Sequence, residues 1–119
     1  ILHLAYAFIP VGAFALGLAL VTGGSSAAAQ HLWMSGAIGA MTLAVMSRAT
    51  LGHTGQALQA DRVTVAVYLS IIAATALRSL APLWAGATHL SGLFWLFAFA
   101  GFLLAYGPAL WRAKPKGSR

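Results

Sequence analysis

The chain has 119 residues, of which 61% are hydrophobic and 7% charged, and its mean hydropathy is +0.85. Soluble domains carry about 25% charged residues because a small fold has much surface to cover, so this composition excludes a water-soluble globule and makes a lipid bilayer the expected solvent. Seven basic residues against one acid give a net charge of +6, which in a membrane protein encodes orientation, and we expect no nucleic-acid partner.

Four segments are long and apolar enough to cross about 30 Å of hydrocarbon, which takes about 20 residues. The first two cover about residues 1–22 and 31–51. Pro10 interrupts the first segment and is expected to kink it, because the ring removes one backbone donor. The polar turn 23–26 ends the first segment, and the glycine-flanked stretch 52–55 ends the second.

The third and fourth segments cover about residues 62–80 and 90–111. Asp61 directly precedes the third segment and is a favourable helix N-cap, and Pro82 follows the end of that segment. Together the four segments predict an all-α, polytopic membrane protein with a single transmembrane helical domain over residues 1–119.

The basic residues predict the orientation, because lysine and arginine in short loops prefer the cytoplasm. In a four-span arrangement, six of the seven fall on one side: Arg48, Arg62, Arg112, Lys114, Lys116 and Arg119. Only Arg78 lies on the other side. We therefore predict that both ends are cytoplasmic, with residues 112–119 as a basic tail. Since the chain begins inside an apolar run without a charged leader, we interpret it as the C-terminal fragment of a longer protein.

Small residues recur at helical spacing in the first two segments. Gly36, Ala40 and Ala44 form one such stripe, and Ala13 with Gly17 forms another. In membranes, small residues let helix backbones approach closely. The alternative is that any helix rich in alanine and glycine contains such stripes by chance.

Arg48 is the strongest single polar signal inside a predicted span. An arginine at the bilayer centre costs at least about 2.5–3.5 kcal/mol on insertion scales, so an intramembrane arginine is a functional hypothesis by default. Arg48 lies about one turn inside the predicted cytoplasmic boundary. It either extends its guanidinium to the lipid headgroups or contacts an anion within the bundle, such as a carboxylate or a propionate.

The four histidines fall at two depths. His3 and His53 lie near the predicted cytoplasmic side, whereas His31 and His89 begin the two segments that start on the opposite side. On a continuous helix, His31 and His53 are about 33 Å apart and cannot share one metal. The candidate pairs for a metal or haem between helices are therefore His3 with His53 and His31 with His89, since imidazole is a common ligand for both.

Each histidine also has a simpler explanation. His31 and Met34 share a helix face at spacing i, i+3 and would suit copper, but His31 could also serve as a helix cap. His89 could be an interfacial polar residue. For His53, the glycines on either side allow either close approach of a flat ligand or a helix end that needs glycine to turn.

Several kinds of chemistry are excluded by what the chain lacks. It has no cysteine, which excludes a disulfide framework, Cys-ligated zinc, an iron–sulfur cluster and a thiol nucleophile. It contains no Walker loop and no dinucleotide fingerprint. With Asp61 as its single acid, carboxylate proton relays and acid–base hydrolysis are nearly excluded. The residues leave open whether the protein is an enzyme.

A stretch in the middle of the chain resembles the signature of a known family. Residues 36–55 read GAIGAMTLAVMSRATLGHTG, which is similar to the signature of the NnrS family. The flanking features are similar too: His3 with Tyr6, His31, and the Tyr-Gly-Pro of residues 106–108. Members of that family are bacterial polytopic inner-membrane proteins that contain haem and copper and belong to the nitric oxide response.

The resemblance implies a haem- and copper-containing protein of the bacterial inner membrane. It suggests His3, His31 and His53 as candidate ligands and Arg48 as the partner of a negatively charged cofactor group. We assign His3, His53 and Arg48 to haem binding. The candidate metal ligands are His3, His31, His53, His89 and Met34.

The leading hypothesis is an inner-membrane protein that protects cells against nitric oxide and nitrosative stress, with nitric oxide or a related small molecule as its ligand. A complete site would draw on further helices of a longer chain or on a second copy. The first alternative is a non-enzymatic copper-handling protein that uses His31 and Met34. The second is a structural four-helix subunit of a larger membrane complex, with its histidines as interfacial polar residues.

Overall fold

The computed structural model describes residues 1–111, which contain helices joined by short loops and no strand. The helices are α1 (Leu2–Thr22), α2 (Ser26–His31), the π-helix η1 (Leu32–Gly39), α3 (Ala40–His53), α4 (Arg62–Ser79) and α5 (Gly86–Trp111). The all-α prediction is therefore confirmed. The predicted basic tail, 112–119, lies outside the described residues.

Three helices, not the predicted four, are each long and apolar enough to cross a membrane: α1, α4 and α5. The remaining predicted span, 31–51, falls in three consecutive elements, α2, η1 and α3. Its backbone stays helical without a break from Ser26 to His53, but the π-helix divides it, so no single α-helix there reaches spanning length. We refer to this continuous run, residues 26–53, as the middle rod.

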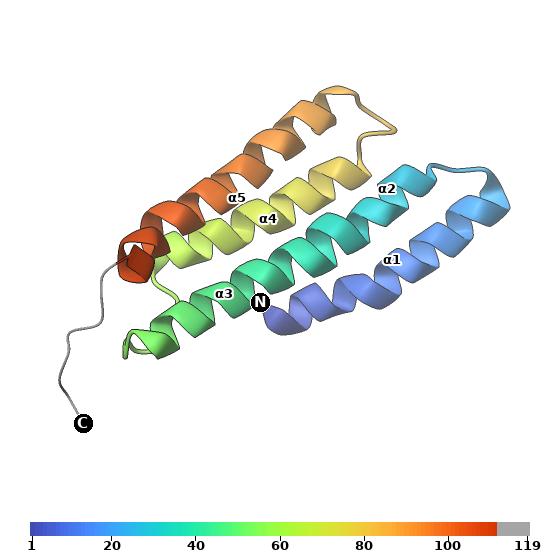
Figure 1. Cartoon of the computed structure of the whole chain (residues 1–119). Helices are drawn as coiled ribbons and strands as arrows, with labels where there is room; N and C mark the ends of the chain where they lie inside the picture. The colour runs from blue at the N-terminus through green and yellow to red at the C-terminus, as the bar shows by residue number, and fades with distance from the viewer. Residues whose placement is uncertain (112–119) are drawn as a thin grey trace.

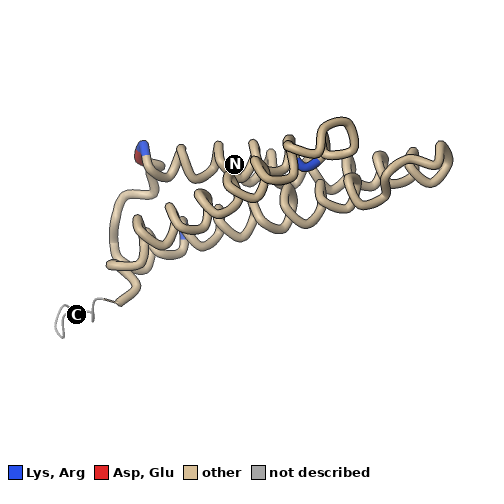
Figure 2. Tube along the Cα trace, turned by 90° about the horizontal axis from the view of Figure 1, so that it is seen from above, with Lys and Arg blue, Asp and Glu red and all other residues tan. Residues whose placement is uncertain are grey.

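The helices lie side by side as antiparallel rods (Figure 1). The helix α1 forms one edge and contacts only the middle rod, while α4 and α5 pair along their length and cover the rod's other side. The loops 23–25 and 80–85 share one end of the molecule, which we call the two-loop end. The loop 54–61 lies at the opposite, one-loop end. Charged residues are few along the described trace, as Figure 2 shows.

Glycines allow α1 to pack closely against the middle rod. A Cβ added to Gly12 would lie 2.5 Å from the Trp33 ring, and one added to Gly36 would lie 2.6 Å from the Phe8 ring. The Trp33 indole N–H also donates to the carbonyl of Ile9, at 2.8 Å. The Trp33 ring of the middle rod thus lies against Gly12 of α1, and the Phe8 ring of α1 lies against Gly36 of the middle rod. Any larger residue at either position would overlap the facing ring.

The predicted small-residue stripe of the second segment is buried, including Gly36, Ala40 and Ala44. By contrast, Ala13 and Gly17 of the first segment are exposed, so the stripe that these two residues form is not a packing face in this chain. The difference follows from the position of α1 at the edge of the molecule, where only one of its sides meets a neighbour.

Side-chain hydrogen bonds link α4 to the other rods. Three join two side chains, Ser47 with Tyr68, Ser35 with Thr75 and Thr64 with Tyr106, and in a fourth the Ser91 hydroxyl donates to the carbonyl of Ala74. Such bonds between membrane helices contribute on the order of 0.6 kcal/mol each. No buried side-chain nitrogen or oxygen in the described residues is left without a partner, so α4 is the centre of a fully satisfied polar network.

Candidate functional sites at the two ends of the bundle

At the one-loop end, His53 is the last residue of α3 and its side chain is exposed. The chain then turns through Gly55, which has a φ of +70°. The amide of Gly55 donates to the carbonyl of Gly52 and the amide of Gln56 to that of Leu51. This pattern is a Schellman motif, which favours glycine at the left-handed position. The glycines around His53 could serve either close approach of a flat ligand or a turn that ends the helix. The second role accounts for Gly55.

An exposed stripe leads along α3 to His53. Thr42, Met46, Ala49 and His53 are spaced by three or four residues, so they share one face of the helix, and all four are exposed. An open, apolar hollow of about 330 Å³ lies at the inner part of this stripe, lined by Met41, Thr42, Val45 and Met46. The outward face of α3 thus presents one imidazole at the end of an apolar surface.

Arg48 lies on α3 outside this stripe, about 140° around the helix from His53 at 3.6 residues per turn, and its side chain is exposed. It is five residues before His53, or about 7.5 Å along the helix axis. The exposed guanidinium is accessible to lipid headgroups or to an acidic group of a ligand at the surface of α3.

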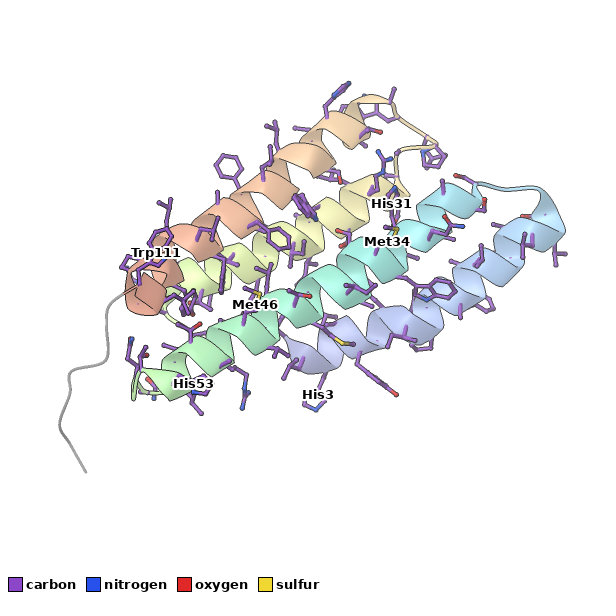
Figure 3. All side chains as sticks on the ribbon, viewed as in Figure 1. His3, His31, Met34, Met46, His53 and Trp111 are labelled. Atoms are coloured by element: carbon purple, nitrogen blue, oxygen red, sulfur yellow. The ribbon has the colours of Figure 1, made fainter. Side chains whose placement is uncertain are left out.

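The structure does not bring His3 and His53 together. In the antiparallel pairing of α1 with the middle rod, Phe8 faces Gly36 and Gly12 faces Trp33. Extending this register puts His3 level with about residue 42, which is some 16 Å along the helix from His53. Figure 3 shows the two histidines at separate positions along the molecule. At this separation His3 and His53 do not reach one metal ion or one haem iron together.

The two-loop end contains a pocket of about 250 Å³ that is open on one side. Its polar lining consists of Ser25, His31, Arg78 and Thr88, and its apolar lining of Ala27, Ala28, Ala81 and Pro82. His31, Arg78 and Thr88 are all half-buried. The residues come from α2, α4, the start of α5 and both loops, so residues far apart in sequence meet there.

The other predicted residues at this end do not line the pocket. His89 follows Thr88 and is exposed. Met34 is 61% exposed and lies three residues after His31, but the intervening backbone is π-helical. The expectation that His31 and Met34 share a face assumed α-helical spacing, and π-helical hydrogen bonds run from i to i+5. In the described residues, no group of three or more histidines and acids could hold a metal ion.

Arg78 is a pocket residue that the sequence analysis did not single out as functional. The sequence did contain a feature that could have pointed to Arg78, because it is the one basic residue that the predicted topology assigns to the side opposite all the others. Its proximity to His31, however, depends on how α4 packs against α2, which the spacing of apolar residues does not specify.

The all-helical fold and its three apolar helices of spanning length are compatible with a membrane protein. Comparison with known families identifies it further. The sequence matches the NnrS family, described as NnrS protein, over residues 1–114, and the chain belongs to this family. No curated protein and no solved structure matched the chain. The resemblance noted around His53 is therefore confirmed at the level of the family.

Proposed function

We propose that this chain is part of a haem- and copper-binding inner-membrane protein of the nitric oxide response that protects bacterial cells against nitrosative stress. The observation that carries the proposal is the NnrS match over almost the whole chain. The outward stripe of α3 that ends at His53 supports it, because it offers an imidazole beside an apolar surface.

The proposed arrangement has four crossings, with the middle rod as the fourth. The continuous helix from Ser26 to His53 supports this, since its length along the axis is sufficient for a bilayer even with a π-helical segment. The one-loop end and both chain ends would then face the cytoplasm. Arg48 and Arg62 lie toward that end, in agreement with the preference of basic residues for the cytoplasmic side.

The residues of α3 fit haem through a single histidine. His53 would hold the haem iron, the stripe residues Met46 and Ala49 would contact the apolar ring, and Arg48, extending round from another side of α3, would hold a propionate by charge-assisted hydrogen bonds. Haem iron that keeps an open axial position binds diatomic gases. His3, some 16 Å away along the axis, would serve a different ligand.

Copper would need ligands from more than one of the candidate positions. His3, His31, His89 and Met34 remain candidates, and within the described residues the histidines and the acid form no group of three that could hold a metal ion. We therefore propose that a copper site is completed by further helices of a longer chain or by a second copy.

The haem content of a matched pair of variants tests the proposal. We expect His53→Ala to remove most of the haem that co-purifies with the chain in detergent, whereas His89→Ala, an exposed histidine at the other end, leaves it unchanged. Haem is quantified as the pyridine complex, and copper by metal analysis of the same samples. Unchanged haem in His53→Ala would contradict the assignment. Copper without haem in the parent chain would instead favour the copper-handling function. Absence of both haem and copper would favour a structural subunit.

A further inference from the structure

We propose that the pocket at the two-loop end is an oxyanion-binding site that recognises a phosphate-type group. The guanidinium of Arg78 would be the principal contact, with the imidazole of His31 and the hydroxyl of Thr88 as further hydrogen-bonding groups. This site is separate from the His53 stripe and does not depend on haem or copper.

The geometry supports a ligand site because polar groups from three helices converge on one open pocket of about 250 Å³. Arg78 lies in the last turn of α4, His31 at the end of α2 and Thr88 in the first turn of α5. Among the described residues, neither the Arg78 nor the His31 side chain forms a hydrogen bond, so their donors are free to contact a ligand.

The charge of Arg78 gives the sign of that ligand. Asp61 is the single acidic side chain of the chain, and it caps the opposite end of α4, about 26 Å away at 1.5 Å per residue. No acidic side chain of this chain can therefore pair with Arg78. A half-buried cation is costly unless an anion compensates it, which makes an external anion the expected partner.

The surroundings of the pocket favour an anionic ligand. Arg78 and His31 line the same pocket, so the guanidinium and the imidazole can contact one bound group. The first turn of α5 adds a partial positive charge from the helix dipole. A guanidinium with its fork of N–H groups matches the oxygens of a phosphate group best.

A phosphate-type group could come from a lipid headgroup or from free phosphate, and one experiment separates the two. The whole 119-residue chain is purified in dodecyl maltoside, which contains no phosphorus. Binding of inorganic phosphate is followed by ³¹P line broadening at pH 7. In a parallel arm, retention of phosphatidylglycerol through detergent exchange is measured by native mass spectrometry.

The variants are chosen to isolate the pocket. We expect Arg78→Gln to weaken saturable binding at least about tenfold, since a hydrogen bond to a charged group is lost, and Thr88→Val to weaken it a few-fold. Arg62→Gln removes the same charge from the exposed, opposite end of the same helix and should change binding less than about twofold. Circular dichroism and gel filtration establish that each variant is folded. If Arg78→Gln does not fold, Arg78→Lys replaces it, with an intermediate loss expected.

Each outcome decides the proposal. Phosphate binding that depends on Arg78 and Thr88 supports the site with a free anion as ligand. Retention of phosphatidylglycerol with the same dependence, and no binding of free phosphate, supports the site with a lipid headgroup as ligand. Absence of saturable binding in both arms, or an equal loss in Arg62→Gln, would overturn it.

Discussion

The close contact between α1 and the middle rod depends on single residues. Gly12 and Gly36 lie where an aromatic ring from the facing helix fills the space of a side chain. Gly17, on the same helix as Gly12, has open space where a Cβ would be. The two glycines of α1 therefore differ in packing although both are glycines in the interior of one apolar helix.

This difference gives a prediction at the residue scale. Gly12→Ala should lower the free energy of unfolding by about 1–3 kcal/mol, because the added methyl group overlaps the Trp33 ring and forces the helices apart. Gly17→Ala should leave it unchanged or raise it by up to about 1 kcal/mol, since alanine is the better helix former. Unfolding of both variants by dodecyl sulfate in mixed micelles measures the effect, and equal stability of the two would contradict this packing.

The residues that the sequence identified correctly are those whose role is local. Asp61 caps α4 as predicted, accepting from the amide of Thr64 at 2.8 Å, because capping depends only on neighbours in the chain. Arg48 was recognised as an unusual charge, yet its outward orientation could not be read from spacing alone. His31 was identified as a candidate ligand without its neighbour Arg78, which approaches it only through the packing of the rods.

At the scale of helices, the π-helix η1 is the feature that sequence reasoning missed. Apolar length and composition predict a span over 31–51, but they do not distinguish α from π hydrogen bonding, since both hide the backbone donors and acceptors equally well. The π segment contains Trp33 and Gly36, which both pack against α1. Its local geometry is thus tied to a tertiary contact rather than to helix propensity.

The cap of α4 gives a pH-dependent prediction at this scale. Hydrogen bonding by Thr64, through its side chain first and its backbone amide second, holds the pKa of the Asp61 carboxyl below its ordinary value. A carboxylate with a lowered pKa in the folded state contributes stability above the unfolded pKa of about 3.9, and this contribution is lost as the pH falls through the folded pKa.

We therefore expect Asp61→Ala to cost about 0.5–2 kcal/mol of stability at pH 7, the usual range for loss of an N-cap. The difference from the parent chain should shrink below about pH 4, as the carboxylate becomes protonated. Asp61→Asn should retain most of the stability, because asparagine caps about as well, and should lose the pH dependence. Chemical unfolding of the three chains at several pH values provides the measurement. A difference independent of pH would contradict the role of the ionised cap.

At the scale of the whole molecule, the number of crossings is the main structural expectation still to be tested. The overall order of apolar segments was predictable because each one is long, and hydrophobic length is read directly from the sequence. The middle rod is different, since its proposed crossing would need three consecutive elements, α2, η1 and α3, to act as one helix. Its ends lie at opposite ends of the molecule.

Single cysteines in this cysteine-free chain test the topology. Gly24→Cys at the two-loop end should react with a membrane-impermeant maleimide added to intact cells, whereas Gln59→Cys at the one-loop end should react only after the membrane is opened. A reversed pattern would contradict the orientation. Labelling of both positions from the same side would mean that the middle rod does not cross the bilayer.

We propose that the chain is part of a haem protein of the nitric oxide response, with His53 as a haem ligand. The most direct measurement is the absorption spectrum of the purified chain, reduced and then exposed to nitric oxide. We predict a Soret band that shifts when nitric oxide is added, and no such band in His53→Ala. A spectrum without a Soret band in the parent chain, or a full nitric oxide shift in His53→Ala, would contradict the account.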